Sequence, residues 1–380
     1  MTTTIDGSNE STFAAGVTCT ALNGGQLAGN RNVIIGGNFT TNPWQRGTSF
    51  TNLANVQFSA DRFQVAYVQD GVVDVIKTAD SPTAAEAGTY SSHCLHLDVT
   101  TADSSLAANQ RYFIRHHVEG LNTVGFGFGQ AGARPITLSF WVKSTKTGTF
   151  CVALRNSASD RFFISEYTVN STDTWEKKTI SITADTTGTW LATNGIGLRI
   201  EWVIALEGTT FTATAGSWQT GDKIGTTNQV NGLDSASNDF KLALIQLEEG
   251  SVATPFERRP IGTELALCQR YYHKLGYTSG GRFAAGMAAT ATLGEVIINF
   301  PTTMRISPTA LEQSGTASDY QMLYQGGNKV CDAVPLFKTS TQNNACIRLT
   351  DSDAGMSVGF AILGRYGTSD TGFLAWSVEL

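Results

Sequence analysis

The sequence predicts a mostly β protein made of antiparallel sandwich or barrel sheets, and three observations support this class. Apolar and polar residues alternate with a period of two in several runs, as they do in half-buried strands. Turn-forming clusters rich in Gly, Ser and Thr separate these runs, and the chain contains 39 glycines. No long helical period interrupts the pattern. Because the chain has 380 residues, we expect two or three domains.

The N-terminal stretch differs in composition from the rest of the chain. Residues 1–30 are rich in Thr, Ser, Gly and Asn and hold few large apolar side chains, so they cannot bury enough surface to fold alone. We expect an extended attachment arm here. Ile5 and Phe13 are its candidate anchors, because large apolar side chains can enter pockets on a partner surface.

Strand-like alternation begins after residue 30 and defines a first β domain over residues 31–256. Its clearest runs are 136–142, 198–206 and 240–246; in the last, Phe240, Leu242, Leu244 and Gln246 are expected on one face. The prolines at 255 and 260 then mark a boundary, because proline disfavours helix at the residue before it.

A linker and a short helix are expected over residues 257–277, followed by a second β domain over residues 278–380. The apolar face of the helix runs from Leu265 to Leu275, with Thr263 as its N-terminal cap and Gly276 as its end. Beyond the helix, alternation returns at residues 295–300, 345–349, 357–363 and 373–378.

Composition excludes several classes of function. The net charge is −6 and no basic stripe is present, which argues against a nucleic-acid partner. No apolar run approaches about 20 residues, so no membrane insertion is expected. The start of the chain lacks the features of a signal peptide. For a chain made in a reducing cytoplasm, we expect free, mostly buried thiols; a Cys331–Cys346 pair remains an open alternative.

The motifs that could carry catalysis or bind metal are weak. Gly355-Met-Ser-Val-Gly359 matches a nucleophile-elbow string, but a strand pattern follows where a helix is needed, so Ser357 is expected to be non-catalytic. His93 alternates in direction with Cys94 and His96, and too few ligands converge for zinc. We therefore expect no catalytic residue, no metal, no cofactor and no enzyme activity.

Three groups of residues resemble bacteriophage virion proteins of the tail-fibre or head-fibre type. The most specific is Gln246-Leu-Glu-Glu-Gly-Ser-Val-Ala-Thr-Pro-Phe-Glu-Arg-Arg-Pro260, running into residues 264–272. The others are Gly36-Gly-Asn-Phe-Thr40 with residues 44–48 and 60–63, and residues 300–309 with the ending 374–380. The resemblance implies a carbohydrate-binding-like jelly-roll β-sandwich for residues 31–256, a short linking helix, and a second β-sandwich after it.

The resemblance also implies a role. We expect a phage virion structural protein on the particle surface, assembled in the host bacterial cytoplasm: a short fibre or adhesin that binds host glycan. A capsid decoration or cement protein that stabilises the head without a ligand is the main alternative, and a polysaccharide depolymerase is a minor one. The expected partners are other virion proteins of the capsid or tail, further copies of the chain in a homotrimer, and host surface glycan.

Jelly rolls of this kind often hold a structural calcium ion beside an acidic residue of the first strand. Here Thr40 stands in place of that acid, and the last strand, residues 240–246, lacks one as well. Calcium favours carboxylate and carbonyl oxygens, so we expect no calcium.

Tryptophans are the remaining candidates for glycan contact, because sugars stack on exposed aromatic faces. Trp190 and Trp218 lie in turn-like sequence, and Trp141 falls on the outward face of its strand. The alternative is that these rings are buried against a neighbouring subunit.

Overall fold

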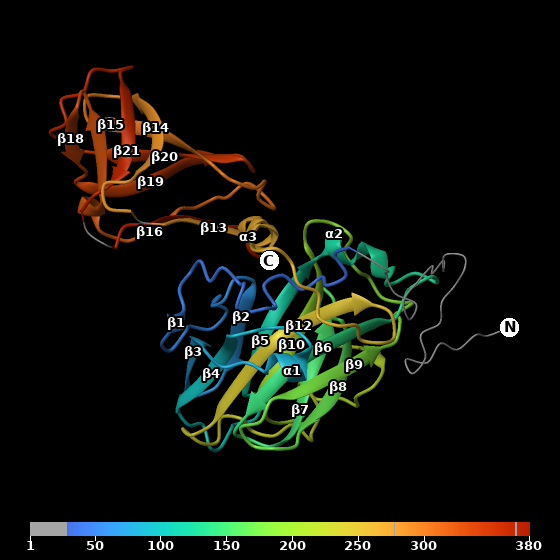
Figure 1. The fold of residues 1–380 in the computed structure, drawn as a ribbon. Coiled ribbons are helices and arrows are strands. Elements are labelled where there is room, and N and C mark those ends of the chain that lie inside the picture. The colour runs from blue at the N-terminus through green and yellow to red at the C-terminus, as the bar shows by residue number, and fades with distance from the viewer. Residues whose placement is uncertain (1–28, 277, 369–370) are drawn as a thin grey trace.

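The computed structural model describes residues 29–276, 278–368 and 371–380, which form two β units connected around one short helix (Figure 1). The prediction of a mostly β fold with several antiparallel sheets and few short helices is confirmed. Ile5, Phe13 and almost all of the expected arm lie outside the described residues.

The first unit is a sandwich of two six-stranded sheets. The first sheet has the order β1 (Ser49–Phe50), β3 (Val72–Thr78), β4 (Cys94–Thr101), β12 (Asp239–Glu249), β6 (Ile136–Ser144) and β9 (Glu176–Ile182). The second sheet has the order β11 (Trp218–Thr220), β8 (Arg161–Val169), β7 (Gly148–Arg155), β10 (Ile196–Leu206), β5 (Arg111–Glu119) and β2 (Phe63–Val68). The short helices α1 (Ala84–Ala87), α2 (Gly120–Thr123) and η1 (Val124–Phe126) lie in its connections.

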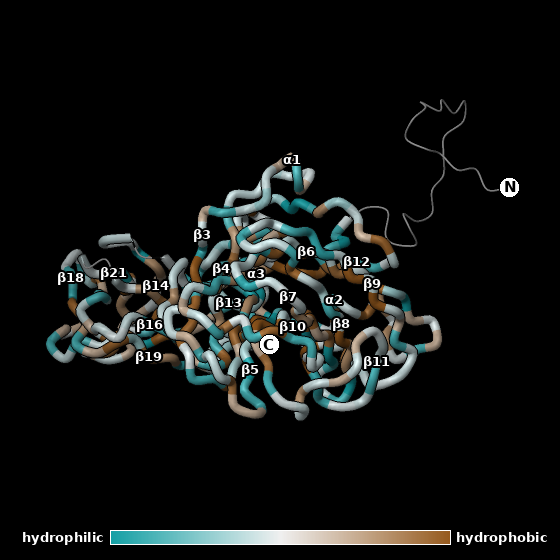
Figure 2. Tube along the Cα trace, turned by 90° about the horizontal axis from the view of Figure 1, so that it is seen from below, coloured by the Kyte–Doolittle hydropathy of each residue, from teal (hydrophilic) through white to brown (hydrophobic). Residues whose placement is uncertain are grey.

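The core of the sandwich fills the space between the two sheets. Phe63, Phe140, Phe150 and Trp202 are fully buried there. Their rings meet edge-on or tilted; for example, the centroids of Phe140 and Trp202 are 5.9 Å apart. In Figure 2 the hydrophobic colour follows the central strands of this unit. Burial of large rings is the main stabilising term of such a core, at roughly 1.5–3 kcal/mol for each large side chain.

One predicted run does not alternate as expected. In β12 the pairing with β6 shifts between Ala243 and Gln246, and Leu244 has a positive φ of 49°. This bulge turns Leu244 to the outer side, where it packs with Trp141, while Ile245 enters the core. The expectation that Leu244 and Gln246 share the face of Phe240 is therefore wrong.

The second unit contains a three-stranded and a seven-stranded sheet. The smaller has the order β13 (Tyr272–Leu275), β22 (Leu374–Ser377) and β16 (Glu312–Gln313). The larger has the order β18 (Gly327–Val330), β17 (Tyr320–Tyr324), β21 (Ala361–Tyr366), β14 (Arg282–Ala288), β15 (Leu293–Asn299), β20 (Asn344–Thr350) and β19 (Ala333–Ser340). The short helix η2 (Ala317–Asp319) directly precedes β17. Trp376 and Tyr320 are fully buried in its core.

The connecting helix α3 (Ile261–Gln269) is shorter than the sequence suggested. Pro260 occupies the cap position, so Thr263 lies inside the helix and is not its cap. The helix ends before Tyr272, which pairs with Ser377 as part of β13, so Gly276 does not end it. Pairing with β22 supplies the backbone hydrogen bonds that a longer helix would have supplied, and this tertiary contact decides the conformation.

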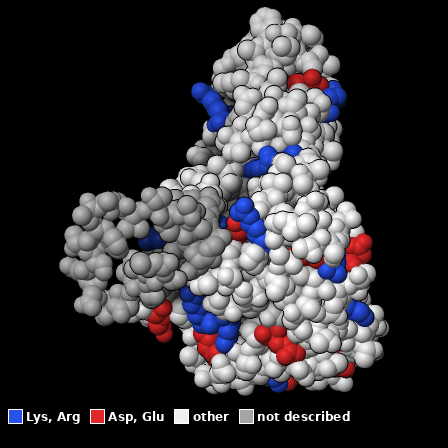
Figure 3. Space-filling model, turned by 90° about the vertical axis from the view of Figure 1, so that its right-hand side faces the viewer, with Lys and Arg blue, Asp and Glu red and all other residues white. Residues whose placement is uncertain are grey.

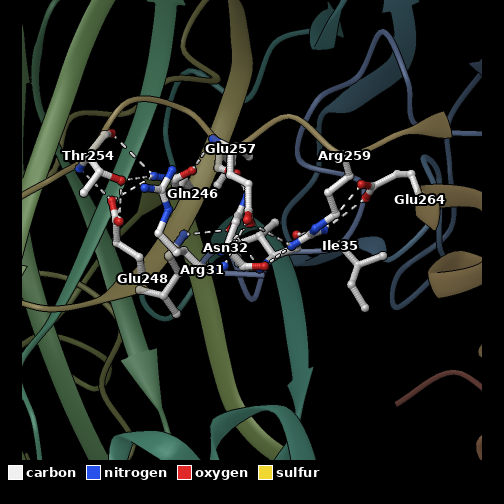
Figure 4. Close-up of polar contacts among 12 residues, drawn as sticks. Arg31, Asn32, Ile35, Gln246, Glu248, Thr254, Glu257, Arg259 and Glu264 are labelled. Atoms are coloured by element: carbon white, nitrogen blue, oxygen red, sulfur yellow. Dashed lines mark hydrogen bonds and ion pairs between the residues drawn. The ribbon is translucent and has the colours of Figure 1, made fainter. Parts of the chain in front are cut away.

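A polar network ties the linker to the start of the sandwich (Figure 4). Glu257 accepts hydrogen bonds from the backbone nitrogens of Arg31 and Asn32, at 3.1 and 2.8 Å. Arg259 donates to the carbonyls of Asn32 and Ile34, and Glu264 of α3 accepts from the nitrogen of Gly36. The residues that carried the resemblance at 36–40 and 246–264 thus lie side by side.

Charged side chains also cross between the two units. Arg46 and Arg62 of the sandwich both pair with Glu379. Arg270, directly after α3, forms two hydrogen bonds with Glu119 at the end of β5, at 2.9 and 2.6 Å. Arg62 is fully buried with its guanidinium 3.5 Å from the ring centre of Tyr271. The units are therefore joined by buried ion pairs as well as by the chain.

We predict that the Glu248→Ala substitution destabilises the sandwich by at least about 2 kcal/mol. Glu248 is buried and accepts three hydrogen bonds, from the nitrogen and hydroxyl of Thr254 and from the amide of Gln246. Its loss leaves buried donors unsatisfied, at about 1–3 kcal/mol each. The matched control is Glu249→Ala, which removes only a pair with the exposed Arg134 and should cost under about 1 kcal/mol. Equal free energies of unfolding in urea for the two variants would contradict the network's role.

The second prediction concerns acid stability. Burial lowers the pKa of His273 from 6.5 to about 4, so the folded protein keeps this ring neutral. Between pH 7 and pH 4 the unfolded chain takes up a proton that the folded chain does not, and stability is lost as the pH falls. The His273→Leu variant should lose less stability across this window, by on the order of 3 kcal/mol, when unfolding is measured in urea at both pH values. Identical pH dependence in both proteins would refute this.

Candidate functional site

A groove of about 250 Å³ crosses the outer face of the second sheet of the sandwich. Side chains from β2, β5, β7 and β10 form its floor, because residues at every second position of a strand share a face. Register places Arg115 opposite both Gln64 and Glu201, and Arg199 opposite Arg155. Three arginines from three neighbouring strands therefore converge on one end of the groove.

Arg155 is held by two carboxylates. Its guanidinium forms a bidentate pair with Glu201, with N–O distances of 2.7 and 2.6 Å, and it also pairs with Asp222. Glu201 is completely buried, whereas the Asp222 side chain is 53% exposed. Although burial lowers the pKa of Arg155, the two carboxylates raise it overall. This fork is consequently a fixed structural element of the groove wall.

The other arginines of the groove have neutral partners. Arg115 Nε donates to Gln64 Oε1 at 2.5 Å, and Arg199 donates to Ser159 Oγ and to the Ser157 carbonyl, at 2.5 and 2.9 Å. Arg111 donates to the carbonyl of Asn109, at 2.9 Å. Within the described residues these three form no ion pair with a carboxylate.

The far end of the groove combines apolar side chains with Arg111. Phe113 and Val203 lie on the same sheet face, and the connection 207–225 folds over them with Phe211 and Ile224. The guanidinium of Arg111 lies over the Phe211 ring, 4.0 Å from its centre. The groove thus combines rigid guanidinium donors with ring surface, the two kinds of contact by which proteins hold polar ligands with apolar faces.

A second feature is an aromatic corner formed by Phe128, Trp190 and Trp218. The centroids of the two tryptophan rings are 5.3 Å apart, and each ring meets Phe128 edge-on. A hollow of about 140 Å³ lies beside Phe128 and Trp190. The structure therefore brings together two of the three tryptophans that the sequence singled out, with one phenylalanine of the string Gly125-Phe-Gly-Phe-Gly129.

Hydrogen bonds fix the orientation of both tryptophan rings. Trp190 Nε1 donates to the carboxylate of Asp185, at 3.1 Å, and Trp218 Nε1 donates to the Thr183 carbonyl, at 2.7 Å. Asp185 is itself buried and held by a bidentate contact from Arg161, at 2.8 and 2.6 Å. The corner is preorganised, and both rings keep part of their surface open to solvent.

Trp141 lies apart from both features. It is on the outer face of the first sheet, as its strand position suggested, but only 8% of it is exposed. Leu244, Trp175 and Phe256 pack around it. Within this chain Trp141 is covered by the linker and by a neighbouring loop, which the local alternation could not reveal.

At Thr40, where similar jelly rolls carry an acidic calcium ligand, the side chain takes part in hydrogen bonds within the protein. Thr40 Oγ1 accepts from the backbone nitrogens of Ser92 and His93, at 2.9 and 3.2 Å, and contacts Ser91 Oγ at 3.1 Å. No carboxylate joins these contacts, so the residues do not fit a calcium cage. Across the described ranges, no group of three or more His, Cys, Asp or Glu side chains is placed to bind a metal ion.

The structure also locates the Gly355–Gly359 string and the cysteines. Ser357 lies in the turn before β21, between Gly355 and Gly359, and its nitrogen donates to the Tyr324 hydroxyl. The strand expected over residues 357–363 begins only at Ala361, so Ser357 itself is not part of it, but a strand and not a helix follows the string. Cys331 and Cys346 are both free thiols, which removes the disulfide alternative, and Cys94, Cys151 and Cys268 are free as well.

Sequence reasoning missed the groove. Its arginines are isolated in sequence and separated by up to 88 residues, so no charge run marks them. On the face drawn in Figure 3, charged side chains likewise form small separate groups. The arginines of different strands come together only through the pairing register of β5, β7 and β10. A single sequence does not reveal that register.

No protein-family model matches the chain, and no curated protein matches it. Among solved structures, the enzymatically active domain of tailspike protein 4 from bacteriophage CBA120 is 11% identical, with a TM-score of 0.31; the match covers 57% of this chain and 21% of that one. The carbohydrate-binding module TmCBM61, solved with β-1,4-galactotriose, is 10% identical with a TM-score of 0.29, covering 58% of this chain and 99% of that one.

A family 11 carbohydrate-binding module from Clostridium thermocellum, solved with a β-1,3-1,4-mixed-linked tetrasaccharide, is 9% identical with a TM-score of 0.28, covering 55% and 98%. This chain thus spans about a fifth of the tailspike chain. These similarities of fold are distant and place the chain in no family. In the part of the chain that the structure describes, no helix is long and apolar enough to cross a membrane.

We predict that Glu201→Gln destabilises the sandwich by about 3 kcal/mol, because it leaves the buried Arg155 fork without its main counter-charge. Asp222→Asn is the matched control: it removes the exposed carboxylate from the same arginine and should cost no more than about 1 kcal/mol. Urea unfolding of both variants at neutral pH measures the difference. A loss for Asp222→Asn as large as that for Glu201→Gln would show that burial does not set the strength of this pair.

Proposed function

We propose that this protein is a phage virion surface protein, a short fibre or adhesin, that binds host glycan in the groove of the second sheet. The observation that carries the proposal is the groove itself, in which Arg115, Arg155 and Arg199 lie at one end and the half-buried Phe211 ring, with Arg111 over one face, lies at the other. The sequence resemblance to fibre and decoration proteins supports the location on the particle. In this proposal the chain binds glycan without cleaving it.

The groove suits saccharides because of the chemistry of a sugar ring. Hydroxyl groups around the ring edge accept hydrogen bonds from guanidinium donors, which Arg115 and Arg199 present from a rigid sheet. The C–H face of the ring packs on aromatic surface, which Phe211 offers at the groove edge. Both contacts come from strands or from a loop fixed on them, so binding would require little rearrangement.

The aromatic corner favours a second role, contact with another protein. Beside the Phe128–Trp190–Trp218 cluster, Leu121 is 51% exposed and Val124 is 61% exposed. Apolar side chains next to fixed tryptophans are typical of protein interfaces. In this reading the corner serves contact with a further copy in the homotrimer or with a capsid or tail protein, which is also what a decoration protein requires.

The proposed function predicts that a groove-blocking variant loses glycan binding. Val68 lies at the groove edge and is 49% exposed, so Val68→Trp should fill the groove without removing any charge or core contact. Val330→Trp is the matched control, because Val330 is 48% exposed on β18 of the second unit. We expect wild type and Val330→Trp to bind the same members of an array of bacterial surface polysaccharides, and Val68→Trp to bind at least 10-fold more weakly.

Other results of these experiments would contradict the groove site, the glycan-binding function or the trimer. Binding that Val68→Trp leaves unchanged, but that Trp218→Ala abolishes, would move the glycan site to the aromatic corner. Absence of binding to every polysaccharide would reject the glycan-binding function and favour the decoration role. Light scattering of the same preparations tests the trimer, since a mass near 40.6 kDa would show a monomer.

A further inference from the structure

The charge of the groove is unbalanced. Four arginines line it, at positions 111, 115, 155 and 199, and only Asp222 among the lining residues is acidic. Glu201, buried below the floor, supplies one further negative charge. Both carboxylates bind Arg155. The local excess of positive charge is notable in a chain whose net charge is −6.

Arg111, Arg115 and Arg199 carry this excess, because none of them pairs with a carboxylate in the described residues. Arg115 and Arg199 are the two beside the Arg155 fork, since Arg115 lies opposite Glu201 and Arg199 opposite Arg155. Each is satisfied in part by neutral oxygens, and Arg199 Nε is buried without a hydrogen-bond partner in the described residues. A guanidinium presents five N–H donors in a planar fork, which matches two oxygens of a carboxylate or phosphate. The hydrogen bonds above use one N–H group of Arg115 and two of Arg199, so each guanidinium keeps further N–H groups for a ligand in the groove; the buried Arg199 Nε is not one of them.

Burial and neighbouring charges act on the pKa of both residues. Burial lowers the pKa of Arg199, and the nearby positive charge of Arg155 lowers it further, against the attraction of Glu201 and Asp222. For Arg115, burial likewise lowers the pKa, and Arg199 and Arg155 act in the same direction against the attraction of Glu201. Arginine stays charged at neutral pH despite such shifts, so both guanidiniums can form charge-assisted hydrogen bonds with an anion.

We infer that the groove selects acidic glycans, in which a carboxylate or phosphate group on a sugar binds between Arg115 and Arg199. The inference rests on the proposed glycan-binding function and names its substrate class. The fixed fork of Arg155 forms the wall behind this anion position, and Ser159 lines its edge. The neutral part of the sugar chain would then continue toward Phe211.

The experiment compares each acidic polymer with its own neutralised form. The probes are bacterial surface polysaccharides of known structure that carry uronic acids, that carry phosphate, or that are neutral. Uronic acid carboxyls are reduced to primary alcohols, and phosphomonoester side groups are removed with hydrofluoric acid, so that each pair differs only at the acidic group. Affinities are measured by titration calorimetry for wild type, Arg115→Gln, Arg199→Gln and the control Arg134→Gln, whose side chain is 61% exposed away from the groove lining.

We expect the acidic form to bind about 10- to 100-fold more tightly than its neutralised partner, as one charge-assisted contact implies. Arg115→Gln and Arg199→Gln should remove most of this preference while their melting temperatures stay near that of wild type; Arg134→Gln should retain it. Whether the uronic or the phosphate arm shows the effect identifies the anion.

Three results would overturn the inference. Equal affinity for acidic and neutralised forms, with binding still lost in Val68→Trp, would leave the groove as a neutral-glycan site. Equal competition by single-stranded DNA would show an unselective attraction to anions. Failure of all polysaccharides to bind would reject the proposed function itself, and this inference with it.

Discussion

The rest of the structure depends on one closure, in which the linker is hydrogen-bonded to the first residues of the sandwich. Glu257 and Arg259 bind the backbone of residues 31–34 across more than 220 positions of sequence. These backbone groups are buried and would otherwise lack partners, which is costly in a protein interior. The same closure fixes the start of α3 through Glu264 and Gly36. It thereby sets where β13 begins and lets Arg46 and Arg62 reach Glu379 of the second unit.

The closure also explains why the candidate groove lies where it does. The linker and Phe256 cover the outer face of the first sheet around Trp141, so that face is closed. The outer face of the second sheet is covered only in part, by the connection 207–225. What remains open there is lined by four arginines, of which Arg155 is held from below by Glu201. Both groups of this pair are buried, so the loss of either one would leave an uncompensated charge inside the protein.

Much of the fold could be predicted from the sequence, whereas the site could not. Strand alternation located β6 and most of β10, because a period of two is a local property of the chain. It failed at Leu244, where a bulge changes the face, and at Tyr272, where pairing with β22 replaces helix. Trp190 and Trp218 were found because their flanking sequence is turn-like, but Trp218 in fact begins the short strand β11, and the contact between the two rings depends on tertiary packing. The arginines carried no local signal, since their convergence is a matter of register between strands.

The two candidate surfaces lie on opposite sides of one sheet and can therefore act independently. Leu198 and Arg199 are neighbours in β10, so their side chains point to opposite faces. Leu198 belongs to the core and lines the hollow beside the aromatic corner, whereas Arg199 lines the groove. Trp218 pairs with Phe163, whose ring also faces the core side. A protein bound at the corner would leave the groove open, so a subunit anchored through its tryptophans could still present arginines to a glycan.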